Sequence, residues 1–382
     1  MTIHTTFVSI VIASALTACA MPDTPAETLS SDELATAPHI ALCREAAPGE
    51  AQCTTHALAD AYGDLRSNTL PAGYGPGDLR SAYKVTGLGS AASTIAVVTA
   101  LGYPNAEADL AMYRSTYGLP ACTSTSGCFR KVNQTGASSP LPAFNLGWAQ
   151  TAAVGLDMAS ALCPSCKLVL VEATSASFAN FATAENTAAG LAHTVSNAWG
   201  GSEAGSTSFE PAFNHAGIAI VAPAGDPGFG AAQFPASSPH VTAVGATSLK
   251  PALATLRGWT ETAIGAQGAC STLYAKPAWQ HDTFCPTHRT AIDVAAVGDA
   301  STGVAVYAPM SATTSAFAVF GGTAVSASII AGVYGVANDT INAASKAYAT
   351  PSGIFDITTG AGAAVGYDLA TGVGTPNGVS AF

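Results

Sequence analysis

The stretch VFGGTAVSASIIAG, from Val319 to Gly332, decides the fold of this chain. Apolar residues lead into a Gly-Gly pair, and a run of small residues then continues into an apolar segment. This order predicts a buried strand, a tight turn and a long helix over 322–337. Such a turn places the residue after Gly322-Thr323 at the positive end of the helix dipole, where an anion is stabilised. That residue is Ala324, and its methyl group cannot attack a carbonyl carbon.

Strand and helix patterns alternate through most of the chain. The β-branched runs TIAVVTA (Thr94–Ala100) and KLVLVEA (Lys167–Ala173) are typical of parallel strands buried on both faces. We expect further strands over 194–198, 219–222, 241–246, 291–296 and 304–307, and helices over 105–117, 140–162, 177–191 and 210–216. The sequence therefore predicts a doubly wound α/β fold, with a mostly parallel sheet covered by helices on both faces.

The composition allows a large core and excludes some partners. Hydrophobic residues make up 48% of the 382 residues, charged residues make up 10%, and the net charge is −11. A chain of this length can bury the core of one large domain, and we expect a monomer. Nucleic-acid binding is excluded, because no cluster of Lys and Arg exists to neutralise phosphates.

The N-terminus predicts export. The apolar run Phe7–Leu16 is too short to span a bilayer as a mature helix. The following Leu-Thr-Ala-Cys, ending at Cys19, resembles the lipobox of bacterial lipoproteins, in which the cysteine is lipidated. The sequence Ala18-x-Ala20 also suits an ordinary signal peptidase, and the segment before the apolar run has no Lys or Arg. We expect a leader over 1–19 and a protein that is either secreted or anchored to the cell envelope through Cys19, its only membrane contact.

Cysteine usage agrees with export. With Cys19 set aside, the other eight of the nine cysteines fall into close pairs, which predicts four local disulfides. The pairs are Cys43 with Cys53, Cys122 with Cys128, Cys163 with Cys166, and Cys270 with Cys285. A redox or zinc site at Cys163-Pro-Ser-Cys166 is the alternative, although no second Cys/His pair at metal spacing accompanies it.

Two further regions follow the leader. Residues 20–72 begin as a tether rich in Ser, Thr, Pro and acidic residues and continue as a short extension closed by Cys43 and Cys53. Residues 73–382 form the main domain, which opens with a turn and a short helix at Tyr74–Tyr83.

The segments of the main domain resemble, in order and composition, the sedolisin or serine-carboxyl peptidase family, a branch of the subtilisin-like fold. The resemblance runs from about Tyr74 to Phe382. Its most specific segments are PNAEADL (Pro104–Leu110), YGLPAC (Tyr117–Cys122), CFRKVNQ (Cys128–Gln134), SNAWGGSE (Ser196–Glu203), AGDPGFG (Ala224–Gly230) and GYDLATGVGTPNG (Gly366–Gly378). Precursors in this family carry a propeptide much longer than the extension found here.

The resemblance implies a set of catalytic positions that this chain does not fill. The family uses a serine nucleophile, a glutamate base, an aspartate four residues later that orients the base, and an aspartate at the oxyanion hole. Here the nucleophile position is Ala324, the base position is Thr151 and the orienting position is Gly155. The oxyanion-hole aspartate is retained as Asp226, either as a leftover donor or as a turn residue that caps nearby N–H groups. Thr99 stands where subtilisin-like enzymes often have an aspartate.

Neighbouring residues do not replace the missing groups. Gln150 is not a base, Asp157 and Ser326 are turned about 200° away from the required helix positions, and Ser328 should point into packing. Thr323 lies in the turn, but we expect neither a carboxylate nor a histidine beside it.

The resemblance also implies one structural Ca²⁺ near the C-terminus. The ligands would be the carboxylates of Asp356 and Asp368 and the carbonyls of Ile357, Ala364 and Gly366, all of which are hard oxygen donors. The alternative is that the two aspartates are solvated loop residues.

These observations predict an exported sedolisin-like pseudopeptidase that binds a peptide or a protein in the former substrate cleft. An active sedolisin-type serine endopeptidase with a rebuilt site is the alternative, and a purely structural surface protein is a third hypothesis. Bulky substitution at Gly200 or Gly201 should block peptide binding in the cleft.

Overall fold

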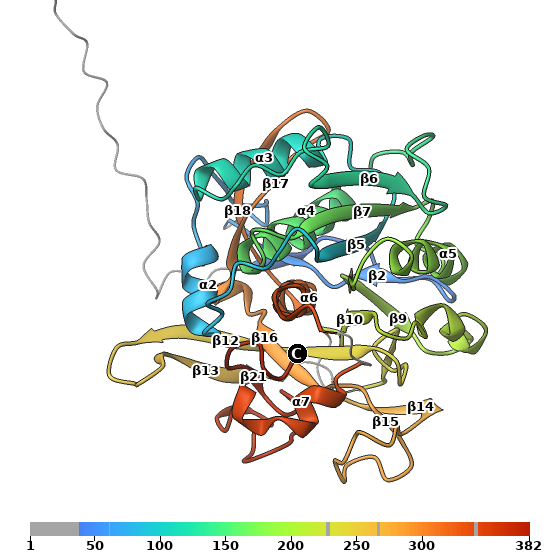
Figure 1. Cartoon of the computed structure of the whole chain (residues 1–382), viewed down its shortest axis with the longest axis vertical. Helices are drawn as coiled ribbons and strands as arrows, with labels where there is room; N and C mark the ends of the chain where they lie inside the picture. Colours follow the sequence, from blue (N-terminus) through green and yellow to red (C-terminus); the bar gives the residue numbers. More distant parts are fainter. Residues whose placement is uncertain (1–37, 61, 227–229, 266–267, 340–342) are drawn as a thin grey trace, which may run out of the picture.

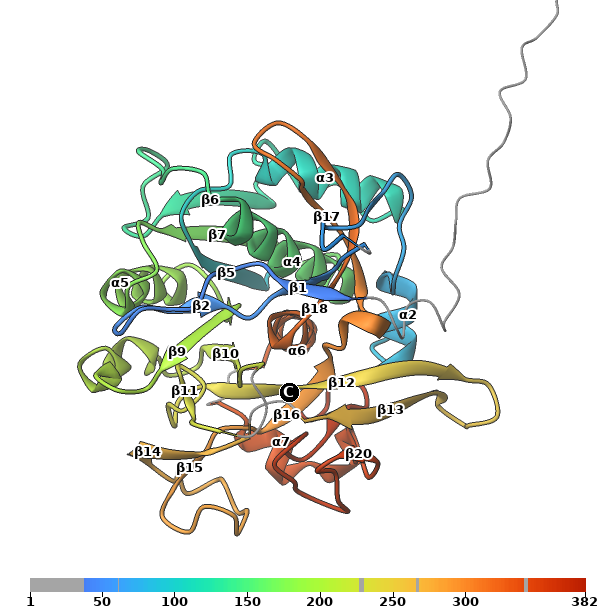
Figure 2. The same ribbon diagram turned by 180° about the vertical axis from the view of Figure 1, so that it is seen from behind.

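A mixed sheet with helices on both faces forms the centre of the molecule (Figures 1 and 2). The computed structural model describes residues 38–60, 62–226, 230–265, 268–339 and 343–382. The strands of this sheet lie in the order β20-β13-β12-β10-β8-β5-β7-β6, with β16 beside β12. Their bounds are β5 Thr94–Ala100, β6 Phe129–Asn133, β7 Lys167–Ala173, β8 Thr194–Asn197, β10 Ala219–Pro223, β12 Thr242–Ala252, β13 Gly258–Ile264, β16 Val294–Val297 and β20 Gly360–Ala361. From β6 across to β16 all neighbouring strands are parallel, whereas β12 and β13 are antiparallel.

Side chains that alternate along the strands fill one core on each face of the sheet. In β5, Ile95 and Val97 pack into one core, and Ala96 and Val98 pack into the other. The first core lies under α4 and α6, and the second lies under α5. The helix bounds are α2 Pro76–Ala82, α3 Ala106–Thr116, α4 Leu146–Leu162, α5 Phe178–Ala189, α6 Thr323–Ala337 and α7 Ser345–Ala349. The predicted doubly wound α/β class is confirmed.

Several predicted elements have other bounds or another type, among them the helix expected over 140–162, which begins at Leu146, and the strand expected over 304–307, which continues to Pro309. Strand β12 continues to Ala252, because beyond the parallel part it pairs with β13 in a hairpin. Strand β16 begins only at Val294, because the residues before it are engaged by the side chain of Arg289. The helix expected over 210–216 is a short 3₁₀ turn, η2, at Glu210–Phe213. The other 3₁₀ turns are η1 Ser206–Ser208, η3 Ala300–Thr302 and η4 Pro351–Gly353.

The N-terminal extension is built into the main domain. It contributes β1, β3 and β4 to a second sheet of order β1-β3-β18-β17, in which β4 also pairs with β18. It also contributes β2 to a small sheet of order β11-β9-β2. The bounds are β1 His39–Ala41, β2 Gln52–Cys53, β3 His56–Leu58, β4 Ser67–Asn68, β9 Trp199–Ser202, β11 Gln233–Phe234, β17 Val304–Pro309 and β18 Ser315–Gly321.

Two short hairpins and four disulfides complete the described part. Strand β14 (Cys270–Ala275) pairs with β15 (His288–Thr290), and β19 (Ile354–Phe355) pairs with β21 (Thr375–Pro376). The predicted disulfides are confirmed at Cys43–Cys53, Cys122–Cys128, Cys163–Cys166 and Cys270–Cys285. The sulfurs of Cys163 and Cys166 are therefore bonded to each other, and among the described residues no group of three His, Cys, Asp or Glu side chains is placed to hold a metal.

None of the helices in the described ranges is long and apolar enough to cross a membrane. Cys19 and the predicted leader lie outside the described residues.

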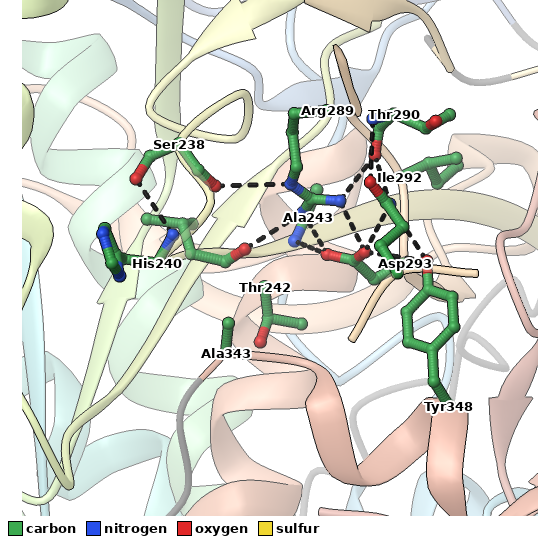
Figure 3. Close-up of polar contacts among 12 residues, drawn as sticks. Ser238, His240, Thr242, Ala243, Arg289, Thr290, Ile292, Asp293, Ala343 and Tyr348 are labelled. Carbon is green, nitrogen blue, oxygen red and sulfur yellow. Dashed lines mark hydrogen bonds and ion pairs between the residues drawn. The ribbon is translucent and has the colours of Figure 1, made fainter. Parts of the chain in front are cut away.

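A buried ion pair ties β15 and β16 to the start of β12 (Figure 3). Arg289 and Asp293 are both fully buried and form a two-pronged ion pair, in which Nη1 of Arg289 lies 2.7 Å from Oδ1 of Asp293. The guanidinium also donates to the carbonyls of Val241 and Thr290, and Asp293 accepts the N–H of Ala243 at 2.8 Å. Both charges are therefore satisfied inside the protein, as a buried pair requires.

We predict that Arg289→Met lowers the free energy of unfolding by about 3–5 kcal/mol, because it leaves the buried carboxylate of Asp293 without its cation. Urea unfolding followed by circular dichroism measures this change. The control is Arg44→Ala, which breaks an ion pair with Glu50 whose arginine is 81% exposed. The control should cost about 0–1 kcal/mol, and a loss this small for Arg289→Met would contradict the prediction.

Candidate functional site

The strand, turn and helix predicted from the stretch 319–332 are confirmed and form the floor of the site. Strand β18 ends at Gly321, Gly322 has a φ of +91°, and α6 begins at Thr323. Ala324 follows in the first turn of α6 and is fully buried. Its N–H group points out of the helix N-terminus, where the backbone has no intrahelical acceptor for it.

An extended segment of the chain's own extension covers this helix N-terminus. Its first half pairs with β9, with Gln52 opposite Gly200 and Cys53 opposite Trp199 in antiparallel register. Its second half pairs with β18, where His56 lies opposite Gly321. We call residues 50–57 the resident strand. It bridges the two walls of the site as an added β-strand, in the manner by which many proteins bind extended peptides.

The carbonyl of Thr54 occupies the place where a nucleophile on α6 would act. The N–H of Ala324 donates to this carbonyl at 3.1 Å, and the N–H of Thr54 donates to the carbonyl of Ala198 at 3.4 Å. A Cβ on Gly322 would lie 2.2 Å from the same carbonyl oxygen, so only glycine permits the approach. The peptide bond between Thr54 and Thr55 is therefore presented to residue 324 as a substrate bond would be, but residue 324 carries a methyl group.

The position of the missing base holds a neutral hydroxyl. Thr151 Oγ1 lies 3.0 Å from Thr55 Oγ1 and donates to the carbonyl of Gly147 at 2.9 Å. One turn further along α4, Gly155 faces the sheet, and a Cβ there would lie 2.5 Å from Cγ1 of Val97. A side chain at this position therefore requires the side chain of Val97 to move.

Asp226 accepts hydrogen bonds from both sides of the site. Its Oδ1 receives the N–H of Thr323 at 2.7 Å and the hydroxyl of Thr323 at 2.8 Å. Its Oδ2 lies 3.0 Å from Nε2 of His56 on the resident strand. Through these contacts the carboxylate joins the start of α6 to the resident strand.

The hydrogen bond from His56 to Asp226 raises the pKa of the imidazole above 6.5, against an opposing effect of burial and with help from the negative charge of Asp226. The edge of the His39 ring faces the His56 ring, with 5.3 Å between the ring centroids. A hollow of about 130 Å³ beside this pair is the open part of the site. It is lined by His39, His56, Asp226, Ala246, Ile264, Gly265, Gly298, Asp299, Ala300, Gly322 and Thr323.

The expectation that Thr323 has no carboxylate or histidine beside it is wrong. Its hydroxyl donates to Asp226, and His56 lies on the other oxygen of the same carboxylate. The expectation failed because Asp226 and His56 are distant from Thr323 in sequence. In a Ser-His-Asp triad, however, the imidazole lies between the hydroxyl and the carboxylate. Here the carboxylate lies between the other two, and Thr323 is only 1% exposed.

The remaining polar residues considered as substitutes point away from the resident strand. Ser326 donates to carbonyls of β16, and Ser328 donates to the carbonyl of Ala324 within α6. Asp157 accepts the N–H of Tyr307 on β17, and burial raises its pKa well above 3.8. Gln150 also donates to a carbonyl of β17. Thr99 is buried in β5.

The candidate calcium residues lie in one loop, and their carboxylates already accept backbone hydrogen bonds. Asp356 is exposed and accepts the N–H of Gly366 at 2.8 Å, while Asp368 is 1% exposed and accepts the N–H of Ala364 at 2.9 Å. Asp368 also receives three donors from residues 370 and 371. The loop thus brings the candidate ligands together, but a cation would have to displace donors from Asp368. Ile357 is buried beside Ala370.

With this geometry established, the fold is that of the sedolisin and subtilisin-like proteases. A Pseudomonas sedolisin, described as a serine-carboxyl proteinase complexed with two molecules of pseudo-iodotyrostatin, superposes with a TM-score of 0.68 at 22% identity over 80% of this chain and 96% of its own. Sphericase gives a TM-score of 0.52 at 19% identity, covering 81% of this chain and 99% of its own. A psychrophilic protease, S41, gives 0.54 at 17% identity, covering 81% and 98%. No protein-family model and no curated protein sequence matches this chain.

The residues that sequence reasoning missed are Thr54, Thr55 and His56. The prediction treated the extension as a tether with a small disulfide loop and did not connect it to the site. Two signals were available: the β-branched Thr-Thr pair after Cys53 is typical of a strand, and the disulfide to Cys43 fixes its start.

We predict that Asp226→Asn lowers the pKa of His56, because the amide removes the negative charge and the acceptor that hold the imidazolium. A raised pKa in the folded state gives a stabilising contribution that is fully present below pH 6.5 and is lost as the pH rises through the folded-state pKa. The variant should therefore lose stability at pH 5.5 relative to pH 8.5. NMR titration of the imidazole and urea unfolding at both pH values measure this.

The matched control is Asp299→Asn, which changes a carboxylate lining the same hollow whose Oδ1 accepts the N–H of Ser301. The control should leave the His56 titration close to that of the wild type. A pKa of His56 that is equal in wild type and Asp226→Asn would contradict the role of the pair.

Proposed function

We propose that this chain is an exported, catalytically inactive homologue of the sedolisin-type peptidases, and that its cleft binds an extended peptide strand. The observation that supports the proposal most strongly is the hydrogen bond from Ala324 to the carbonyl of Thr54. A peptide bond lies in the reactive position, and the residue that faces it has no nucleophilic atom.

The size of the expected loss in turnover rate supports the proposal that the chain is catalytically inactive. Removal of a nucleophile from a peptidase triad lowers turnover by about 10⁶-fold, and the remaining rate comes from binding and the oxyanion hole. Here Ala324 stands at the position of the nucleophile, Thr151 at that of the base, and Gly155, packed against the side chain of Val97, at that of the orienting carboxylate. Asp226, the one retained group, is used for hydrogen bonds to Thr323 and His56.

The resident strand supports a binding role. Both walls, β9 and β18, have an edge on which the resident strand forms main-chain hydrogen bonds. The resident strand is an intramolecular ligand, and its effective concentration is on the order of millimolar or higher. An external peptide therefore competes with the resident strand for the groove.

Export and anchoring are proposed from the sequence. Disulfides form in oxidising compartments, so the four disulfides support export of the domain. The proposed leader ends near Cys19, and the tether that follows would hold the domain at the envelope if this cysteine is lipidated.

We predict that the purified protein does not cleave denatured casein between pH 3 and pH 8, because the site lacks a nucleophile and a base. The single variant Ala324→Ser should also remain inactive, since Thr151 cannot accept its proton. Release of acid-soluble peptides, followed over a day, measures cleavage. Wild-type cleavage would contradict the proposal.

The hydrogen bond between Thr323 and Asp226 is the observation that favours the alternative, an active endopeptidase with a rebuilt site. If casein is cleaved, Thr323→Val distinguishes this pair from a contaminating protease. Cleavage that disappears in Thr323→Val would assign the nucleophile to Thr323.

We also propose one structural calcium ion in the loop of Asp356, Ile357, Ala364, Gly366 and Asp368. The loop offers two carboxylates and three carbonyls, which are the oxygen donors that Ca²⁺ prefers. Its role would be to fasten this loop to the domain through β19 and β20.

We predict that Ca²⁺ at about 100 times its dissociation constant stabilises the protein by about 2.7 kcal/mol relative to EDTA, a rise in Tm of a few degrees. Asp356→Asn should remove this rise, because it deletes the exposed carboxylate without disturbing buried Asp368. Differential scanning calorimetry measures both proteins, and an equal Tm with Ca²⁺ and EDTA would refute the site.

A further inference from the structure

Three consecutive residues of the resident strand contact the three positions that would carry the chemistry. Thr54 contacts Ala324, Thr55 contacts Thr151, and His56 contacts Asp226. Resting on the proposed function above, we propose that the groove is selective for extended peptides with a small residue, then Thr or Ser, then His at these three places.

The first place selects by size. The side chain of Thr54 is 2% exposed, so the groove encloses it completely. Its hydroxyl is buried and has no hydrogen-bond partner among the described residues. The hydroxyl therefore weakens binding through its lost hydration, and Val, which has the same shape without a buried polar group, fits at least as well. A larger side chain such as Phe does not fit.

The second place selects a hydroxyl group. Thr55 is fully buried, and its Oγ1 lies 3.0 Å from Oγ1 of Thr151. Because Thr151 donates its own proton to the carbonyl of Gly147, it accepts the proton of Thr55. The family has a glutamate at this position, and its side chain would carry a charge. Thr151 is neutral, so this place suits the hydroxyl group of Thr or Ser. Val at this place loses the hydrogen bond.

The third place selects an imidazole. The N–H and the hydroxyl of Thr323 both donate to Oδ1 of Asp226. These two hydrogen bonds orient the other oxygen, Oδ2, toward the resident strand. The imidazole of His56 reaches this oxygen at 3.0 Å, and the two side chains are only 22% and 19% exposed. A charge-assisted hydrogen bond in such a half-buried setting is stronger than a neutral one. Ala at this place loses this bond and leaves Asp226 short of one donor.

The experiment uses the full chain and a fluorescein-labelled peptide with the sequence of residues 48–60, in which Cys53 is replaced by Ser. The protein is the variant His56→Ala, which weakens the resident strand and leaves Thr151, Asp226 and Ala324 unchanged. Fluorescence anisotropy measures binding, and circular dichroism checks that the variant is folded. We expect the peptide to bind this variant about tenfold tighter than the wild type.

Matched peptides test each place. Relative to the parent peptide, we expect His56→Ala in the peptide to bind about tenfold weaker and Thr55→Val about fivefold weaker. Thr54→Val should bind at least as tightly as the parent peptide, and Thr54→Phe should not bind. The protein control adds Gly201→Val to His56→Ala, because a Cβ at Gly201 would lie 2.6 Å from the carbonyl oxygen of Glu50 and so blocks the groove for any strand.

The outcomes separate this inference from the proposed function. If all peptides bind equally and Gly201→Val removes this binding, the selectivity is overturned, but the groove remains a peptide-binding site. Binding that survives Gly201→Val places the peptide elsewhere and overturns the selectivity of the groove. If the folded His56→Ala variant binds no peptide even at peptide concentrations above the effective concentration of the resident strand, both the peptide-binding function and the selectivity are overturned.

Discussion

The hydrogen bond from the N–H of Ala324 to the carbonyl of Thr54 is the contact on which the site depends. It satisfies an otherwise unpaired donor at the start of α6, and it places a dipolar carbonyl at the positive end of that helix. In an active peptidase the same geometry would precede attack on the carbonyl carbon. The side chain of residue 324 is a methyl group, which supplies no atom that could attack the carbonyl carbon.

This contact explains why the extension is part of the fold. The resident strand is extended on both sides, because it continues into the β1-β3-β18-β17 sheet and into the pairing with β9. The disulfide between Cys43 and Cys53 fixes one end, which lowers the conformational freedom that the strand would gain on release. Glycines at 147 and 322 leave room for the carbonyls of Leu42 and Thr54.

The positions at which the resemblance places a nucleophile, a base and an orienting aspartate hold the neutral residues Ala324, Thr151 and Gly155. A buried carboxylate must be paired or hydrogen-bonded, so the loss of one member of a catalytic network makes the others costly to keep. Thr151 and Gly155 relieve this cost, and Gly155 in addition lets β5 pack closely against α4. Asp226 persists because Thr323 and His56 supply donors to both of its oxygens. The buried pair of Arg289 and Asp293 keeps its charges for the same reason.

The sequence by itself determined the α/β class, the four disulfides, the turn before α6 and the identities of residues 151, 155 and 324, because each depends on local pattern or on residue type. The same information left Asp226 with two interpretations and treated the extension as a tether. Only the tertiary structure decided that Thr54, Thr55 and His56 fill the cleft and that Asp226 faces both His56 and Thr323. These contacts join residues 96 to 270 positions apart, as from Thr55 to Thr151 and from Thr54 to Ala324, and no local pattern encodes such pairings.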